Sequence, residues 1–184
     1  MYPNLRMVNE GGVIKTELLI GCGNKREKLF WIPAEGKEWK NLTTLDFDKD
    51  CNPDVVHDLE DLPYPFDDNS FDEIHAYEVL EHTGNQGDWK FFFDQFSELH
   101  RILKPDGIIC ATVPMWNSVW AFGDPSHKRI ISRASITFLY QEEYKKQIGN
   151  TSMTDFRSYW KKDFVPIHME EREHQFMFIL QAKK

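Results

Sequence analysis

The chain has 184 residues and a mass of 21.8 kDa, a length that suits one domain with a substantial core. Its apolar content of 41% and charged content of 28% are ordinary for globular proteins, which excludes a disordered or fibrous chain. With 22 basic and 30 acidic side chains the net charge is −8, which argues against binding nucleic acid or an anionic membrane through bulk charge.

The N-terminal region contains no apolar run as long as a signal peptide or a membrane helix. We therefore expect a single cytoplasmic domain over residues 1–184, with residues 1–15 as an N-terminal extension. The three cysteines, Cys22, Cys51 and Cys110, lie in no CxxC or Cys/His pattern. We expect neither a disulfide framework nor a structural zinc, and no other resident metal.

The first predicted element is a buried strand over residues 16–21, where a short apolar run ends in Gly21-Cys22-Gly23. Two glycines so close together let the backbone turn sharply and approach a ligand. A short helix is predicted next, over residues 25–31, before a proline.

Three more strands follow, and the second strand of the chain ends in acidic residues. These strands are predicted over residues 42–48, 54–58 and 72–79. Asp46 lies 23 residues after Gly23, where a carboxylate can accept hydrogen bonds from both hydroxyls of a ribose. Asp48 is the competing candidate for that role.

Acidic side chains are concentrated over residues 44–82, which hold thirteen carboxylates and one base, Lys49. One interpretation is a solvated acidic face. The other is a binding site for a cationic ligand.

A helix with an Asp88 cap is predicted to run to about Leu103, because apolar residues recur on one helical face. Lys104-Pro105-Asp106-Gly107 then predicts a turn, and residues 108–113 predict a fifth strand. Residues 115–131 are rich in Trp, Gly and Pro and predict a long loop or a lid over a substrate.

The last part of the chain predicts a helix over residues 132–147 and strands over residues 156–165 and 175–181. The early alternation of strands and helices favours a mostly parallel sheet that is covered on both faces. In such sheets ligands bind beyond the carboxyl ends of the strands.

Four segments together resemble the successive motifs of the class I S-adenosylmethionine-dependent methyltransferases, and most closely the small methyltransferase type 11 group, bacterial and phage members included. They are LLIGCGNK, LDFD, PDVVHDLEDLPYPFDDNSFDEIHAYEVLEH and FSELHRILKPDGIICATVP; GDPSHKR at 123–129 is similar as well. The match covers roughly residues 16–131. It implies a Rossmann-like α/β fold with a mostly parallel seven-stranded sheet, an antiparallel last strand and helices on both faces.

The resemblance also implies a cofactor site for S-adenosylmethionine. The turn Gly21, Cys22, Gly23, Asn24 would face the methionine and ribose, and Asp46 with Phe47 the ribose hydroxyls. The motif positions near the adenine and the sulfonium are occupied by Asp58, Leu59, Glu78 and Val79. The family usually has an acid two residues before the first glycine, where this chain has Leu19, so the grip on the methionine amine must be weaker or come from elsewhere.

Methyl transfer needs nucleophile, methyl and sulfur held in line, and sometimes a base. His127, in the presumed lid, and His82, just after the fourth strand, are the candidate bases. Lys128 and Arg129 are candidates to hold an anionic group of the acceptor. Trp116 is a candidate aromatic contact for the substrate or the sulfonium.

The function expected from these residues is methyl transfer to an oxygen or nitrogen of a small-molecule acceptor. Nucleic-acid methylation is disfavoured, because no cysteine follows a proline and the stretch Ala76–His82 lacks an Asp/Asn/Ser-Pro-Pro-aromatic motif. Two alternatives stay open: a binding module for S-adenosylmethionine or S-adenosylhomocysteine without catalysis, and a nicotinamide oxidoreductase on a similar fold. The oligomeric state does not follow from the sequence.

Overall fold

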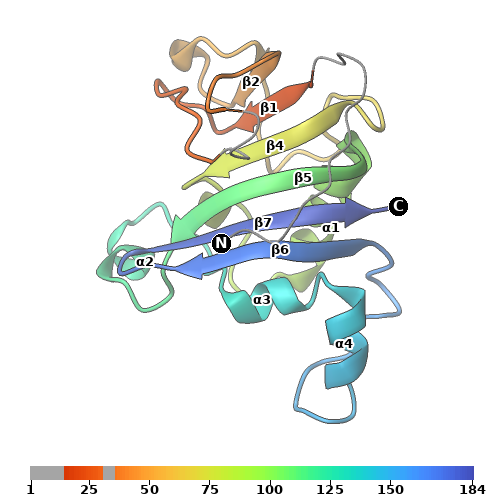
Figure 1. The fold of residues 1–184 in the computed structure, drawn as a ribbon. Helices are drawn as coiled ribbons and strands as arrows, with labels where there is room; N and C mark the ends of the chain where they lie inside the picture. The colour runs from red at the N-terminus through yellow and green to blue at the C-terminus, as the bar shows by residue number, and fades with distance from the viewer. Residues whose placement is uncertain (1–14, 31–35) are drawn as a thin grey trace.

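A computed structural model describes residues 15–30 and 36–184. The centre of the molecule is one seven-stranded sheet in the order β3-β2-β1-β4-β5-β7-β6 (Figure 1). The strands are β1 (Glu17–Ile20), β2 (Leu42–Asp46), β3 (Val55–Val56), β4 (Phe71–Tyr77), β5 (Leu103–Pro114), β6 (Asp163–Glu171) and β7 (Gln175–Lys183).

The first five strands pair in parallel, and β7 pairs antiparallel with both β5 and β6. This confirms the predicted Rossmann-like sheet with its antiparallel last strand. The chain moves outward from β1 to β2 and β3, and then crosses to β4 on the other side of β1. The strand order therefore reverses between β1 and β4, and such a switch point is where α/β sheets bind ligands.

Helix α1 (Trp89–Ile102) covers one face of the sheet and lies behind it in Figure 1. Asp88 caps it as predicted, because its side chain accepts a hydrogen bond from the backbone N–H of Phe91. The buried side chains of α1 include Phe93, Phe96 and Leu99, which join the main apolar core. The helix ends at Ile102, and β5 begins at the next residue.

The opposite face of the sheet is packed by Phe30, which forms a second apolar cluster with Ile108, Cys110 and Met177. Phe30 lies in a segment without helical structure, so the helix predicted over residues 25–31 is wrong for residues 25–30. Tertiary contacts decide the conformation there, because the backbone N–H groups of Leu29 and Phe30 donate to the Tyr77 hydroxyl at 3.2 and 3.4 Å. Trp31 lies outside the described residues.

Three short helices follow β5: α2 (Val119–Gly123), α3 (Arg133–Thr137) and α4 (Gln141–Gln147). The single helix predicted over residues 132–147 is therefore split in two. The break falls at Leu139, whose carbonyl accepts a hydrogen bond of 3.0 Å from the N–H of Phe164, the second residue of β6. The strand predicted over residues 156–165 begins only at Asp163, because Tyr159 and Trp160 donate back to the Phe156 carbonyl in a turn.

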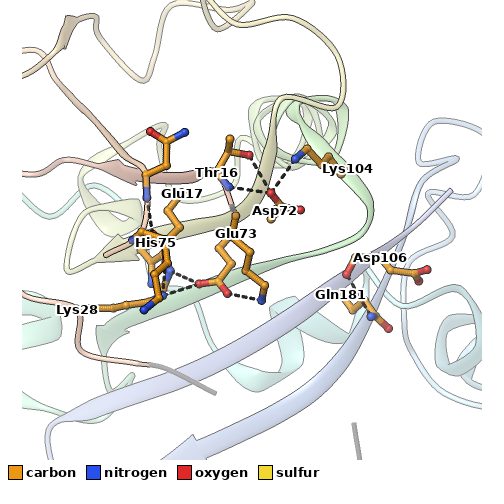
Figure 2. Close-up of polar contacts among 12 residues, drawn as sticks. Thr16, Glu17, Lys28, Asp72, Glu73, His75, Lys104, Asp106 and Gln181 are labelled. Carbon is orange, nitrogen blue, oxygen red and sulfur yellow. Dashed lines mark hydrogen bonds and ion pairs between the residues drawn. The ribbon is translucent and has the colours of Figure 1, made fainter. Parts of the chain in front are cut away.

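A buried ionic network lies on β1 and β4 (Figure 2). Lys28 bridges Glu17 and Glu73, and its Nζ lies 2.9 Å from Glu73 Oε2. His75 Nε2 contacts the same oxygen at 3.0 Å, and Lys15 Nζ lies 3.0 Å from Oε1. Glu17, Glu73 and His75 are each at most 2% exposed, so this network belongs to the core.

Among the described residues, no helix has both the length and the apolar character needed to cross a membrane.

Candidate functional site

A cleft of about 650 Å³ opens at the switch point, beyond the carboxyl ends of β1, β2 and β4. Its size lies in the usual range of small-molecule sites. Nine of its lining residues were singled out from the sequence: Gly21, Gly23, Asp46, Phe47, Asp58, Leu59, Val79, His82 and Lys128. Four others were not: Glu60, Thr83, Pro125 and Ser126.

The turn after β1 requires glycine at its first position. Gly21 has a φ of +58°, and a Cβ added there would lie 2.2 Å from Val79 Cγ2. Gly23 also has a positive φ, +48°, but a Cβ there would meet no atom within 4 Å. Cys22, between them, is buried and donates its backbone N–H to the Leu45 carbonyl at 3.2 Å, which ties the turn to β2.

Asp46 closes β2 with a carboxylate that is fixed from both sides. Its Oδ2 accepts a hydrogen bond of 2.8 Å from the Gly23 N–H, and its Oδ1 accepts one of 2.9 Å from the Asp48 N–H. The Asp48 side chain is engaged elsewhere, because it accepts from the N–H of Asp50 as the cap of a short 3-10 helix, Lys49–Cys51. Asp46 lines the cleft and Asp48 does not, so Asp46 is the better placed of the two candidates. Phe47 beside it is 74% exposed.

The far wall of the cleft is formed by the segment after β3. Asp58 Oδ1 accepts a hydrogen bond of 2.9 Å from the Glu60 N–H, and Leu59 is buried at the base. Glu60 forms an ion pair with Lys128 at 2.9 Å, so the positive charge of Lys128 is neutralised at the cleft rim. Hydrogen bonding to Lys128, against a smaller burial effect, lowers the pKa of Glu60.

Glu78 is placed differently from the expectation. It follows β4 with a φ of +49°, and its Oε1 accepts a hydrogen bond of 2.7 Å from Gln175 Nε2. The left-handed backbone turns this side chain toward β7, so Val79 lines the cleft and Glu78 does not.

The two candidate bases lie together at the edge of the cleft. The His82 and His127 rings have their centroids 4.7 Å apart, at an interplanar angle of 78°. His82 lines the cleft, and its Nδ1 contacts Ser126 Oγ at 3.1 Å. The His127 side chain lies behind it, 9% exposed, with Nε2 4.0 Å from Glu81 Oε1.

Two expected substrate contacts lie away from this cleft. Arg129 is buried, donates to the Leu80 carbonyl and to Thr83 and Gln95, and lines a separate aromatic pocket beside α1. Its position is fixed by the core, so it does not hold a ligand in the cleft. Trp116 is 53% exposed and lines a shallow depression near α3.

A second cavity of about 320 Å³ adjoins the cleft across the glycine turn and shares Gly21 and Gly23 with it. Cys22, Asn24 and Leu19 line it, as does Glu27, an exposed acid that makes no hydrogen bond or ion pair with another described residue. Glu27 was not expected at this place, because the family's usual acid precedes the first glycine. A carboxylate four residues after Gly23 was the available signal. Glu17 does precede the first glycine, but its carboxylate forms an ion pair with Lys28 in the buried network.

A family model described as a methyltransferase domain matches residues 18–111, just over half of the chain. No curated protein matches the sequence.

Solved structures share the fold at low identity. An S-adenosylmethionine-dependent methyltransferase from Archaeoglobus fulgidus is 16% identical, with 91% of this chain and 86% of that chain covered and a TM-score of 0.57. The 1,6-didemethyltoxoflavin-N1-methyltransferase from Burkholderia thailandensis, solved with bound 1,6-didemethyltoxoflavin and S-adenosylhomocysteine, is 13% identical, with 92% of this chain and 72% of that chain covered and a TM-score of 0.56. The N-methyltransferase NodS from Bradyrhizobium japonicum, in complex with S-adenosylhomocysteine, is 13% identical, with 94% and 80% covered and a TM-score of 0.55.

The family match includes both glycines, Asp46, Asp58 and the end of β4, which are the elements that build the cleft. Fold and sequence thus agree, and the chain belongs to the methyltransferase domain family, within the class I S-adenosylmethionine-dependent methyltransferases.

Proposed function

We propose that the cleft binds S-adenosylmethionine and that the protein transfers its methyl group to an oxygen or nitrogen of a small-molecule acceptor. The observation that carries this proposal is the placement of Asp46. Its carboxylate stands at the switch point, held by the Gly23 N–H, and retains lone pairs for the two hydroxyls of a ribose.

The charge of the cleft suits a cationic ligand. Asp46 and Asp58 form no ion pair with a described residue, whereas Glu60 is neutralised by Lys128. Two carboxylates therefore remain to attract the sulfonium and ammonium groups of the donor at short range, where salt screens little. When bound, the donor supplies an electrophilic methyl group.

The acceptor enters from the side of His82, Ser126 and Lys128 in this proposal. Residues 115–131, the proposed lid, supply two of these groups, and helix α2 within them carries exposed Trp120 and Phe122. Exposed aromatic side chains suit a flat or apolar acceptor. His82 lines the cleft and is our candidate to contact the acceptor nucleophile, with His127 behind it.

The experiment is a binding titration followed by an acceptor screen. Isothermal titration should show micromolar binding of S-adenosylhomocysteine and none of NADH. A screen with methyl-labelled donor should then transfer label to one class of hydroxyl or amine compound. Tight binding of NADH would overturn the proposal in favour of an oxidoreductase. Binding without transfer to any acceptor would leave the protein as a non-catalytic binding module.

A further inference from the structure

Three side chains that can bind metal converge at the acceptor edge of the cleft. Glu81 and His82 belong to one short 3-10 helix, Leu80–His82, and His127 comes from the proposed lid. One ligand atom from each lies within 4.8 Å of the others. Glu81 Oε1 and His127 Nε2 are 4.0 Å apart.

Glu81, the buried member of this cluster, is 2% exposed, and neither of its carboxylate oxygens has a hydrogen-bond partner among the described residues. His127 Nδ1 is likewise buried and unpartnered within that part of the chain. A buried polar atom left without a partner costs about 1–3 kcal/mol, and more if it is charged. The two unpartnered oxygens of Glu81 point to a ligand that satisfies them, and His127 faces them through its other nitrogen, Nε2.

Backbone hydrogen bonds hold the two segments together. The N–H groups of Lys128 and Arg129 donate to the Glu81 carbonyl at 2.8 and 3.2 Å. Ser126 Oγ contacts His82 and donates to Asp124 at 2.6 Å, an arrangement that orients the imidazole as outer-shell partners do in metal sites. These bonds hold Glu81, His82 and His127 together at the edge of the cleft.

The donor set indicates the class of ion. One carboxylate and two imidazoles suit a divalent first-row transition metal, and three protein ligands leave positions open. Ligand atoms about 2.1 Å from a tetrahedral ion stand roughly 3.4 Å apart. The cluster thus needs to contract by about 1 Å, which side-chain rotation on a fixed backbone supplies.

We propose that Glu81, His82 and His127 bind a divalent transition-metal ion whose open positions face the cleft. No metal was expected from the sequence, because it has no CxxC or Cys/His pattern; Glu81 and His82 lie 45 or more residues before His127, too far apart for a local spacing pattern. A second part of the proposal rests on the proposed function: the oxygen or nitrogen of the acceptor binds as a further ligand. The ion is then placed to lower the pKa of that group, as zinc does for water.

Co²⁺ titration of untagged, metal-stripped protein tests the site directly. We expect one Co²⁺ per chain, with visible ligand-field bands. Glu81→Gln, which preserves shape, and His127→Ala should each weaken Co²⁺ binding about 100-fold or more. His174→Ala removes an exposed histidine far from the cluster in sequence and serves as the matched control, with unchanged binding.

S-adenosylhomocysteine affinity and the melting temperature of each variant show whether it folds. Weak Co²⁺ binding by wild type, or binding that both variants retain, would overturn the metal site even if S-adenosylhomocysteine binds normally. Tight Co²⁺ binding that both variants lose supports the site, and it does so even if no methyl transfer is found. Failure of the proposed function is thereby separated from failure of the metal site.

Discussion

Asp46 Oδ2 accepts a hydrogen bond of 2.8 Å from the backbone N–H of Gly23, so one carboxylate joins the end of β2 to the turn after β1. The other oxygen is oriented by the Asp48 N–H at 2.9 Å. A carboxylate offers about four lone-pair positions, and these two bonds use one on each oxygen. The side chain is thus both a structural link and an acceptor that faces the cleft.

Replacing Asp46 by Asn should strongly weaken binding of S-adenosylhomocysteine. The variant loses the negative charge and one acceptor, and charge-assisted hydrogen bonds to two hydroxyls contribute roughly 2–5 kcal/mol together. That corresponds to a loss of about 30-fold or more in affinity. Isothermal titration measures it. Asp48→Asn is the matched control, and a larger loss in that variant would transfer the ribose role to Asp48.

The two glycines of the turn should differ in their tolerance of alanine. Both have positive φ, which costs an alanine about 1–2 kcal/mol. At Gly21 the added Cβ also meets Val79 at 2.2 Å, and overpacking of this kind typically costs a further 1–3 kcal/mol. Gly21→Ala should therefore unfold at clearly lower denaturant concentration than Gly23→Ala. Equal midpoints would show that the backbone shifts away from Val79 without cost.

Local patterns predicted the sheet and the cleft because the relevant signals lie close together in sequence. A buried run ending in Gly21 and an acid at the end of the next strand define the edge between β1 and β2 without long-range information. The predictions that were wrong concern segments whose conformation depends on contacts with residues distant in sequence. The conformation of residues 25–30 depends on hydrogen bonds to the Tyr77 hydroxyl. The helix break at Leu139 depends on the hydrogen bond that its carbonyl accepts from Phe164.

The same limit applies to the site residues. The position of Glu78 depends on its left-handed backbone and on Gln175, 97 residues away. The approach of His127 to Glu81 depends on backbone bonds from Lys128 and Arg129 to the Leu80–His82 helix. Spacing rules describe single elements, so contacts between distant segments lie beyond them.

Glu27 should supply the acid that the chain lacks at Leu19. Its carboxylate lines the cavity next to the glycine turn and has no partner among the described residues. Glu27→Gln should reduce affinity for S-adenosylhomocysteine several-fold and leave affinity for methylthioadenosine, which lacks the amino acid portion, unchanged. Glu38→Gln, an exposed acid outside the cavity, is the control. If Glu27→Gln weakens the binding of both ligands equally, Glu27 affects the glycine turn and does not contact the amine of the amino acid portion.

Lys28 should contribute strongly to the free energy of unfolding. Its Nζ lies between Glu17 and Glu73, and its side chain is 3% exposed. Lys28→Met leaves two buried carboxylates without their shared cation, a loss of about 3–5 kcal/mol in the free energy of unfolding. Lys104→Met breaks an ion pair with Asp72 whose side chains are 32% and 26% exposed, and it should cost about 1 kcal/mol or less. Urea denaturation of both variants gives the comparison.

The network also sets how stability depends on pH. Burial lowers the pKa of His75 from 6.5, so the imidazole is neutral, with Nε2–H donating to Glu73 and Nδ1 accepting from Tyr77 at 2.6 Å. Burial raises the pKa of Glu73, but hydrogen bonds from His75 and Lys28 outweigh it and hold the pKa well below 4.5. In both cases the unfolded chain binds more protons at low pH, so stability is lost as pH falls.

Burial raises the pKa of Glu81 to about 8, which changes stability in the opposite direction between pH 8 and pH 4.5. Two steps are therefore expected in a series of urea denaturations from pH 8 to pH 4 on a Glu81→Gln background, which removes that opposing effect. Stability should decline below about pH 6.5, where His75 is protonated in the unfolded chain, and more steeply below about pH 4.5, where Glu73 is. His75→Gln should reduce the first step and Glu73→Gln should reduce the second, although each variant is less stable at pH 8. Burial also lowers the pKa of His100, so His75→Gln/His100→Gln should remove what remains of the first step. A first step that is unchanged in His75→Gln would assign it to His100 or another group.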